Sequence, residues 1–489
     1  MERDIVDAVM PFIEGEPSAS ESEAVDIVNP SIGARLFSIP AGTVEDVNRA
    51  VTSARRAFED GRWCEAPPSF RKHAIHRLAD AIAAHANTLD ALDAEEMGKP
   101  VSVGFCNAAA AANFVRFYAE AVDKIAGDVY VSDKFSFVTQ RRVARGVVAA
   151  IVPWNFPTFC AVLKVAPALA AGNSVVLKPS ELSSRSALLL ARLALEAGLP
   201  TGVFNVVPGL GETVGRALGL HADVDMVTFT GSSEVGKRML QYAGQSNMKL
   251  VMAECGGKSP QIVFADGVDL DAASESIAGF LLTNQGQVCS VGSRLLVHHS
   301  IQDAMIEKIV ARTRQIVMGN ALDPRTTFGP LVSEKQCTRV MRYIENAQMH
   351  EGACLVAGGK RAMPEAGGYF VEPTVFNNVS PTTRIAREEI FGPVLSVIPF
   401  RDEAEAIRIA NSTVYGLAAY VWTASLNTGM RMAKGIRSTV FINSAMPKGE
   451  GAGHADSYEP FGQSGIGTEG GLAGMESYLR RQFVAFNHA

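Results

Sequence analysis

Residues 147–178 read VVAAIVPWNFPTFCAVLKVAPALAAGNSVVLK, and this stretch decides the fold. The apolar runs at 147–152 and 174–178 predict two buried strands, and the residues near 160–171 predict a helix between them. A strand, a helix and a second strand in this order are typical of a parallel sheet that helices cover on both faces. The stretch therefore predicts an α/β fold.

The same alternation continues along the chain. Strands are predicted at 203–207 and 225–229, and helices at 183–197, 212–219 and 234–243. From about residue 257 a second block begins, with strands predicted near 260–264, 292–297, 394–399, 418–422 and 439–442. Ligands of such sheets bind beyond the carboxyl ends of the strands, so the residues that follow each strand are the candidate site residues.

Weaker signals lie outside this alternation. Thr43 and Asp46 predict the N-terminal cap of a helix, because apolar residues follow them at helical spacing. The other predicted elements are helices at 69–97 and 102–124, a strand pair at 128–145, an edge strand in the tail 475–489 and a loosely docked arm at 1–26.

Composition excludes several classes of protein. The chain has 489 residues, 47% of them hydrophobic, which predicts more than one globular domain. A net charge of −6 gives no reason to expect a nucleic acid or an anionic membrane as partner. The seven cysteines are scattered and odd in number, which argues for a reducing, cytoplasmic location and against structural zinc. The N-terminus resembles no signal peptide, and the most apolar region, 146–177, is too interrupted for a membrane helix.

The stretch GQVCS, residues 286–290, holds the first candidate for chemistry. Cys289 has small and polar neighbours and no second cysteine nearby for a disulfide or a metal site. One interpretation is a nucleophile that attacks a carbonyl carbon as the thiolate. On this stretch alone a small buried core cysteine is the better interpretation, so the choice depends on the other motifs.

Two further motifs supply polar groups suited to carbonyl chemistry. Asn155, in VPWNFP at 152–157, offers a side-chain amide at a strand end where an oxyanion can be held, although such residues are usually only turn formers. Glu254 precedes paired glycines in ECGGKSP at 254–260, and a glutamate in a tight apolar turn is suited to be a general base. The alternative for Glu254 is a surface turn.

Acidic and basic residues at predicted strand ends suit a nucleotide. Lys178 and Glu181, in LKPSE, offer hydrogen bonds to ribose hydroxyls, and the alternative is a solvated loop. Glu389 and Phe391, in EEIFGPV, offer a further ribose contact and a packing surface for a ring. As isolated residues they would more often be a capping acid and a core phenylalanine.

The best candidate for a phosphate site is FTGSSEVG, residues 229–236. Here a strand runs into Gly231 and Ser232, and Gly236 lies within the helix that follows. Backbone donors at that helix start, together with the Ser232 hydroxyl, suit a pyrophosphate. The segment PGLGETVG, 208–215, only approximates the dinucleotide fingerprint, and we interpret it as a tight turn.

Taken together, seven motifs resemble, in order and spacing, the aldehyde dehydrogenase superfamily from about residue 25 to 485. They are PWNFP, KPSE, FTGS, ECGGK, GQVC, EEIFGP and a late PFG. The resemblance implies a Rossmann-like cofactor domain, an α/β catalytic domain and a small β arm for oligomerisation. Mapped onto this chain, these are 1–124 with 146–256, 257–471, and 125–145 with 472–489. It also implies a homodimer or homotetramer in which the arm extends a neighbour's sheet.

The resemblance implies a mechanism in two halves. Cys289 adds to the aldehyde to give a thiohemiacetal, whose oxyanion Asn155 and the Cys289 backbone N–H hold. Hydride transfer to the nicotinamide leaves a thioester, which water activated by Glu254 hydrolyses to the carboxylic acid. The presence of this glutamate favours hydrolysis over acyl transfer to another acceptor.

The resemblance also implies a nicotinamide dinucleotide as cofactor. The implied ribose contacts are Lys178, Glu181 and Glu389. The implied pyrophosphate region is Gly231, Ser232 and Gly236. Two further residues, Trp154 and Phe391, correspond to residues near the cofactor. Because an acid at Glu181 repels a 2′-phosphate, NAD is favoured and NADP remains possible.

The substrate channel follows from the same similarity. Its implied lining is Phe117, Phe156, Phe159, Leu163, Val288 and Phe461. None of these carries a charge that would grip a second anionic group, so the expected substrate is an apolar aldehyde, aromatic or of medium chain length. The sequence departs from the family pattern at Cys255, usually leucine, and at PFGQSG, 460–465, which is shorter than the usual late motif and borders the substrate entrance.

Three other interpretations remain open. A semialdehyde or betaine-aldehyde dehydrogenase would have a polar channel, and a substrate panel separates it from the apolar type. A catalytically silent relative would serve as a binding protein, although both Cys289 and Glu254 are present. Esterase activity through the same cysteine is expected only as a side reaction.

Overall fold

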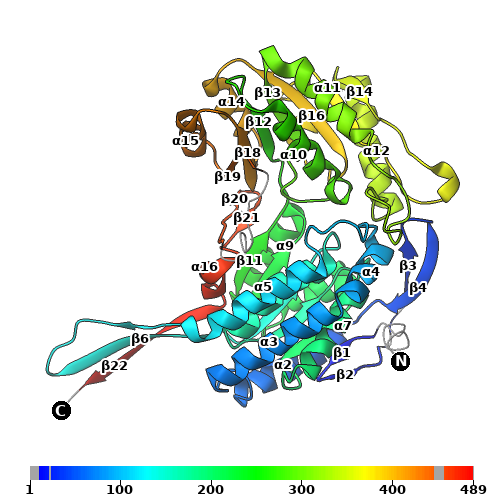
Figure 1. Cartoon of the computed structure of the whole chain (residues 1–489). Helices are drawn as coiled ribbons and strands as arrows, with labels where there is room; N and C mark the ends of the chain where they lie inside the picture. Colours follow the sequence, from blue (N-terminus) through cyan, green and yellow to red (C-terminus); the bar gives the residue numbers. More distant parts are fainter. Residues whose placement is uncertain (1–9, 21, 23, 445–455, 488–489) are drawn as a thin grey trace.

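The structure, a computed structural model, describes residues 10–20, 22, 24–444 and 456–487, and Figure 1 shows their arrangement. Two sheets form the body, each flanked by helices and parallel except at its edges. A narrow three-stranded arm projects from this body. The predicted α/β fold class with its Rossmann-like sheet is confirmed. No helix in the described ranges combines the length and the apolar character needed to cross a bilayer.

The first sheet has five parallel strands in the order β9-β8-β7-β10-β11. They are β9 (Phe204–Val206), β8 (Ser174–Lys178), β7 (Val147–Ile151), β10 (Met226–Thr230) and β11 (Leu250–Glu254). Every residue of β7, β8 and β9 is buried, as expected for strands covered on both faces. Short antiparallel strands extend both edges: β1 (Phe12–Ile13) and β2 (Glu16–Pro17) beside β9, and β21 (Gly465–Ile466) beside β11.

The N-terminal arm is more firmly attached than the sequence predicts. Phe12 is only 4% exposed and pairs with Val206. Strand β3 (Ala24–Asn29) forms a hairpin with β4 (Ala34–Pro40). The prediction of a loosely docked arm is therefore wrong for the described part, because apolar residues within it complete a sheet edge; residues 1–9 lie outside the described ranges.

Helices cover the first sheet. They are α2 (Val44–Glu59), α3 (Pro68–Ala84), α4 (Ala86–Met97), α5 (Ala108–Ala121), the 3-10 turn η1 (Val122–Lys124), α6 (Pro157–Ala170), α7 (Arg185–Glu196), the π-helical turn η2 (Gly211–Gly215), α8 (Arg216–Leu220) and α9 (Ser233–Gln245). The helix predicted at 69–97 is divided at His85, whose φ of −104° leaves the helical range. Helix α5 begins later than predicted because the Asn107 side chain caps it by accepting from the Ala110 N–H.

The second sheet has the order β14-β15-β16-β13-β12-β18-β19, and all but β14 run parallel. Its strands are β12 (Pro260–Val263), β13 (Arg294–His298), β14 (Cys354–Ala357), β15 (Thr374–Asn377), β16 (Val394–Phe400), β18 (Ala418–Trp422) and β19 (Thr439–Ile442). The sequence predicted five of them. Strands β14 and β15 were missed because they flank a stretch rich in glycine and proline.

The helices of the second block are α10 (Leu270–Leu282), α11 (Gln302–Thr313), α12 (Glu334–His350), α13 (Arg384–Arg387), α14 (Glu403–Ala410) and α15 (Leu426–Gly435). Three short 3-10 turns are η3 (Thr283–Gly286), η4 (His299–Ile301) and η5 (Pro364–Ala366). Strands β16, β13 and β12 occupy the centre of this layer, with helices in front of and behind the sheet (Figure 1).

The projecting arm consists of β5 (Asp128–Val129), β6 (Ser136–Ala144) and β22 (Leu479–Asn487). Strands β6 and β22 pair antiparallel along their whole length, from Leu479 with Ala144 to Asn487 with Ser136. The predicted strand pair and the predicted edge strand in the tail are thus confirmed. Its exposed apolar side chains are Val129, Tyr130, Val131, Phe135, Phe137, Phe483 and Phe486.

A late segment connects the edge of the first sheet with a separate two-stranded sheet, β17-β20. Strand β20 (Phe461–Gly462) pairs with β17 (Tyr415–Gly416), and β21 pairs with the end of β11. Between them, the Ser464 hydroxyl donates to the carbonyl of Gly256 at 2.8 Å and accepts from the N–H of Gly416 at 3.0 Å. Helix α16 (Gly471–Glu476) follows and leads into the arm.

The cap of α2 provides a test of the fold. The Thr43 hydroxyl accepts from the Asp46 N–H at 3.1 Å, and the Asp46 carboxylate accepts from the Thr43 N–H at 2.9 Å. We predict that Thr43→Ala lowers the free energy of unfolding by about 1 kcal/mol, because a helix-end donor loses its partner. Urea unfolding monitored by circular dichroism measures it. Thr43→Ser keeps the acceptor and serves as the control; equal stability of the alanine variant and the wild type would contradict the prediction.

Candidate active site

The site lies where the strand order of the first sheet reverses. The chain passes from β7 outward to β8 and β9, and then returns to β10 on the other side of β7. Such a switch point leaves a crevice at the carboxyl ends of the two central strands. Trp154 and Asn155 follow β7, Gly231 and Ser232 follow β10, and Glu254 ends β11. The structure therefore brings five of the predicted site residues to one edge.

The start of α9 has the features of a phosphate site. The Ser232 side chain caps the helix by accepting from the Val235 N–H at 3.3 Å, and the Gly231 N–H donates to the Glu254 carbonyl at 3.0 Å. A Cβ at Gly236 would lie 2.7 Å from the sulfur of Cys255, so the helix packs closely against β11. The buried Thr230 hydroxyl has no hydrogen-bond partner among the described residues. The helix N-terminus and this free hydroxyl fit a pyrophosphate.

Lys178 and Glu181 lie together at the end of β8. The Lys178 ammonium is 3.8 Å from the Glu181 carboxylate and donates to the Pro179 carbonyl at 2.7 Å. Burial lowers the pKa of Lys178, and Glu181 opposes that shift. Glu181 is one-third exposed, at 34%, so its carboxylate remains accessible to ribose hydroxyls.

Trp154 and Phe391 meet edge to face, with ring centroids 5.3 Å apart. Phe391 has a φ of +62°, and the side chain of Gln336 on α12 holds this loop by donating to the Phe391 carbonyl at 2.7 Å. Glu389 accepts from the Gly257 N–H at 3.1 Å, and burial raises its pKa to about 7. The motif EEIFGP thus contacts the turn after Glu254.

The paired glycines after Glu254 are required by their neighbours. A Cβ at Gly256 would collide with the Glu389 carboxylate, and one at Gly257 would lie 2.7 Å from the carbonyl oxygen of Cys289. Side chains at these positions would separate the two loops. The turn therefore packs directly between Glu389 and the backbone of Cys289.

The loop before Cys289 has an unusual backbone. Asn284 and Gln285 adopt left-handed conformations, with φ of +48° and +57°, each of which costs about 1–2 kcal/mol for a residue with a Cβ. The Asn284 amide donates to the Asn155 carbonyl at 2.8 Å, and the Asn155 amide donates to the Gln287 carbonyl at 3.0 Å. The Gln287 side chain accepts from the Val332 N–H at 3.0 Å. These buried amides fix Asn155 relative to the cysteine loop.

Charge is concentrated around the thiol. Burial, followed by the carboxylates of Glu389 and Glu254, raises the pKa of Cys289 to about 12. Glu254 is itself only 5% exposed, and one of its carboxylate oxygens has no hydrogen-bond partner among the described residues. Burial and the nearby Glu469 raise the pKa of Glu254 well above its ordinary value, and Lys164 opposes them.

Sequence reasoning missed the ion pair of Lys164 and Glu469. Both side chains are buried, at 0% and 4% exposure, and the Lys164 ammonium donates to the Glu469 carboxylate. The Tyr458 hydroxyl donates to the same carboxylate at 3.2 Å. A lysine within the otherwise apolar helix α6 was the available signal, because an unpaired lysine is almost never fully buried.

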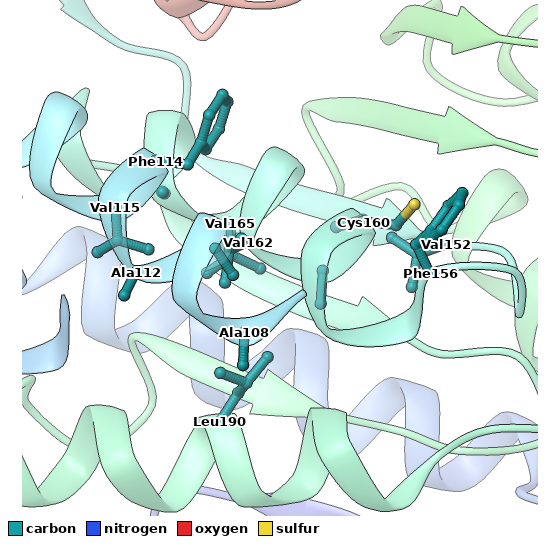
Figure 2. Close-up of a cluster of buried hydrophobic side chains, with 14 of the residues drawn as sticks. Ala108, Ala112, Phe114, Val115, Val152, Phe156, Cys160, Val162, Val165 and Leu190 are labelled. Atoms are coloured by element: carbon teal, nitrogen blue, oxygen red, sulfur yellow. The ribbon is translucent and has the colours of Figure 1, made fainter. Parts of the chain in front are cut away.

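Five of the six predicted channel residues belong to or pack against the large apolar core that extends around α5 and α6, part of which Figure 2 shows; they are Phe117, Phe156, Phe159, Leu163 and Val288. Phe156 contacts Phe105 with centroids 5.5 Å apart, and Phe159 contacts Phe114 at 5.8 Å. The structure does not place Phe461 in this cluster: it lies on β20 and is 53% exposed. Four further residues belong to or pack against this core and were not predicted as channel residues; they are Phe105, Cys106, Phe114 and Cys160.

Among the described residues no group of three or more His, Cys, Asp or Glu side chains is arranged to hold a metal ion. A switch point of the strand order is a place where nucleotides bind, and a cysteine in a neighbouring loop can serve as a nucleophile. A sequence model described as "Aldehyde dehydrogenase family" matches residues 17–484, and the chain belongs to this family. The family predicted from the motifs is thereby confirmed.

Individual relatives agree with this assignment. An NADP/NAD-dependent aldehyde dehydrogenase, PuuC, of Escherichia coli is 42% identical over 479 residues, 97% of this chain and 94% of the relative. An aminoacetaldehyde dehydrogenase of Pseudomonas aeruginosa is 43% identical over 443 residues, 90% of this chain and 87% of the relative. The P. syringae indole-3-acetaldehyde dehydrogenase AldA, solved with NAD+ and IAA, superposes with a TM-score of 0.95 at 44% identity, covering 98% of this chain and 97% of that one.

The thiol environment yields a prediction for the protein without cofactor. Alkylation of Cys289 by iodoacetamide should accelerate about tenfold per pH unit from about pH 7 to 10, because only the thiolate reacts and the pKa is about 12. Mass spectrometry of the Cys289 peptide measures the rate. Glu389→Gln removes a repelling charge and should speed alkylation at about pH 8, whereas Glu388→Gln is the control. A rate that levels off between about pH 8 and 9 would contradict the prediction.

Proposed function

We propose that the protein oxidises an aldehyde to the carboxylic acid with NAD, through a covalent bond to Cys289. One observation carries the proposal: the Gly256–Gly257 turn packs Glu254, Glu389 and the Cys289 loop against the switch point of the first sheet. That arrangement puts a thiol, a buried carboxylate and an amide donor at one crevice. The structures of relatives with NAD+ support the choice of cofactor.

In the first half of the reaction Cys289 loses its proton to water or to Glu254, and its sulfur bonds to the carbonyl carbon, which leaves a negative charge on the oxygen. Asn155 stabilises that charge. Its amide nitrogen has two hydrogens, and the Gln287 carbonyl uses one of them, at 3.0 Å. The second hydrogen is available to the oxyanion, together with the Cys289 backbone N–H.

The cofactor residues fit NAD. When bound, the nicotinamide accepts the hydride of the substrate carbon. The N-terminus of α9 with Gly231, Ser232 and the Thr230 hydroxyl would hold the pyrophosphate, and Trp154 packs with Phe391 beside the crevice. Lys178, Glu181 and Glu389 would hold the riboses. The accessible Glu181 carboxylate repels a 2′-phosphate, so NAD is preferred, and the dual cofactor use in the name of the E. coli relative keeps NADP possible.

In the second half Glu254 takes a proton from the water that attacks the thioester. The carboxylate must be ionised for this role, yet burial and Glu469 raise its pKa. Lys164 lowers the pKa of Glu254, because its buried ammonium, which pairs with Glu469, favours the ionised form of Glu254. The Lys164–Glu469 pair therefore adjusts the pH range in which Glu254 is a base.

The cluster around α5 and α6 supports an apolar substrate, aromatic or of medium chain length. Its side chains are aromatic or aliphatic, and Leu163 leaves more room than an aromatic residue would. The P. syringae relative is named for an aromatic aldehyde, whereas the P. aeruginosa relative is named for an aminoaldehyde. The second candidate is therefore a dehydrogenase of polar aldehydes, of the semialdehyde or betaine-aldehyde type.

Domains and assembly are also part of the proposal. We assign 1–124 with 146–256 to cofactor binding, 257–471 to catalysis and 125–145 with 472–489 to an oligomerisation arm, although β21 pairs with the first sheet. The exposed Phe483 and Phe486 on β22 support burial of the arm in a dimer or tetramer. A cytoplasmic location follows from the scattered cysteines, all seven of them free thiols.

Two substitutions separate the halves of the reaction. Glu254→Gln should give a burst of about one NADH per subunit followed by slow turnover, because the thioester forms but is not hydrolysed. Cys289→Ala should lower turnover at least about a thousandfold with no burst. Stopped-flow absorbance measures both, and Cys354→Ala, which removes an exposed thiol, is the control. Steady turnover at the wild-type rate in either site variant would refute these roles.

A substrate panel tests the channel. We predict kcat/KM at least about tenfold higher for phenylacetaldehyde and octanal than for succinic semialdehyde and betaine aldehyde, because an apolar pocket leaves charged groups without partners. Leu163→Trp should reduce kcat/KM for phenylacetaldehyde more than for acetaldehyde, since it narrows the channel. Faster turnover of succinic semialdehyde than of the apolar aldehydes would favour the second candidate.

A further inference from the structure

A second polar cavity lies behind the turn that follows Glu254. It has a volume of about 10 Å³, room for about one water-sized molecule or ion, and lies at the amino ends of β12, β13 and β18, next to the carboxyl ends of α14 and α15. Lys258, Ser259, Arg294, Leu417 and Ser438 are among its lining residues. None of these residues has a part in the proposed reaction. The motif ECGGKSP supplies two of them, Lys258 and Ser259, directly after the glycines of the active site.

Three polar atoms at this cavity have no partner in the described part of the chain. They are the Lys258 ammonium and the hydroxyls of Ser259 and Ser438. Lys258 and Ser259 are each only 2% exposed, and the Ser438 oxygen is also shielded from solvent. Leaving one buried polar group unsatisfied costs about 1–3 kcal/mol, and more for a charged one. Three hydrogen-bond donors at one cavity therefore indicate a ligand that accepts.

The two buried cations at the cavity favour an anion as this ligand. Arg294 is 1% exposed and donates to three carbonyls, those of Lys258 at 2.8 Å, Ile409 at 3.1 Å and Ala410 at 2.8 Å. No carboxylate forms an ion pair with Lys258 or Arg294 among the described residues, and the Glu389 carboxylate accepts a hydrogen bond from the Gly257 N–H. The carboxyl ends of α14 and α15 supply about half a negative charge each. Glu389, Glu388 and Glu351 act on Lys258 without an ion pair to it, so the Lys258 ammonium has no negatively charged group in contact with it among the described residues.

We propose that this cavity binds one monovalent inorganic anion such as chloride, held by the Lys258 ammonium and the hydroxyls of Ser259 and Ser438. A water molecule would satisfy the hydroxyls but would leave the Lys258 ammonium without a negatively charged partner in contact. Burial and Arg294 lower the pKa of Lys258 to about 7, and a bound anion opposes that shift by favouring the charged ammonium.

The position of the site links it to the active-site turn. Leu417 lines the cavity, and a Cβ at Gly257 would be 3.2 Å from the Leu417 side chain. The bound anion thus stabilises the wall against which the Gly256–Gly257 turn packs. Its principal effect is expected on stability, and the inference is independent of the aldehyde that the enzyme oxidises.

Crystallography with bromide tests the site directly. Crystals of the full chain grown or soaked in sodium bromide should show an anomalous peak within about 3.5 Å of the Lys258 ammonium, because bromide replaces chloride on the same donors. The peak should disappear in Lys258→Met. Ordered density in the cavity without an anomalous signal would identify water and overturn the proposal.

Thermal unfolding provides the solution test. The melting temperature should rise and saturate with sodium chloride but not with sodium gluconate at equal ionic strength, since a ligand that binds only the native state stabilises it. Ser438→Ala should weaken the apparent chloride affinity roughly tenfold, which keeps the test valid if Lys258→Met fails to fold. Lys434→Met, at an exposed lysine of α15, is the matched control and should respond as the wild type does. Equal responses of the wild type to chloride and gluconate, or a rise that does not saturate, would refute the site.

Discussion

The turn at Gly256 and Gly257 lacks side chains because other groups occupy the space that they would need. On one side lies the Glu389 carboxylate, and on the other the carbonyl of Cys289. The first sheet ends at Glu254, immediately before the turn, and the second begins just after it. The distance between a strand that carries a carboxylate and a loop that carries a thiol is therefore set by two missing Cβ atoms. The contacts of this turn with Glu389 and with the Cys289 loop depend on that approach.

Close packing of this kind imposes an electrostatic cost. Glu254 and Glu389 are both buried near Cys289, and all three groups favour their uncharged forms. Within the Lys164–Glu469 pair, only Lys164 offsets part of this cost, because Glu469 adds to it. A buried ion pair contributes little to stability by itself, because desolvation cancels most of the attraction. Its place beside Glu254 is better explained by the charge that it presents to the site.

The sequence predicted the elements whose signals are local. The capping pair Thr43 and Asp46 and the apolar run of β7 need only a few neighbouring residues, so both were found. Signals that depend on distant partners were missed. Lys164 and Glu469 are 305 positions apart, and only folding shows that they pair. The left-handed conformation of Asn284 likewise depends on its bond to Asn155, which no local pattern reveals.

The shortened late motif PFGQSG shows how the fold tolerates a change near the site. Ser464 still bonds to Gly256 and Gly416, and the Cys255 N–H donates to the Ser464 carbonyl at 2.8 Å, so the connection between the sheets is intact. Phe461 meanwhile lies exposed on β20 and away from the apolar cluster. The shorter segment therefore affects the edge of the proposed substrate entrance more than the apolar cluster. The side chains of α5 and α6 are left to define the shape of the proposed channel.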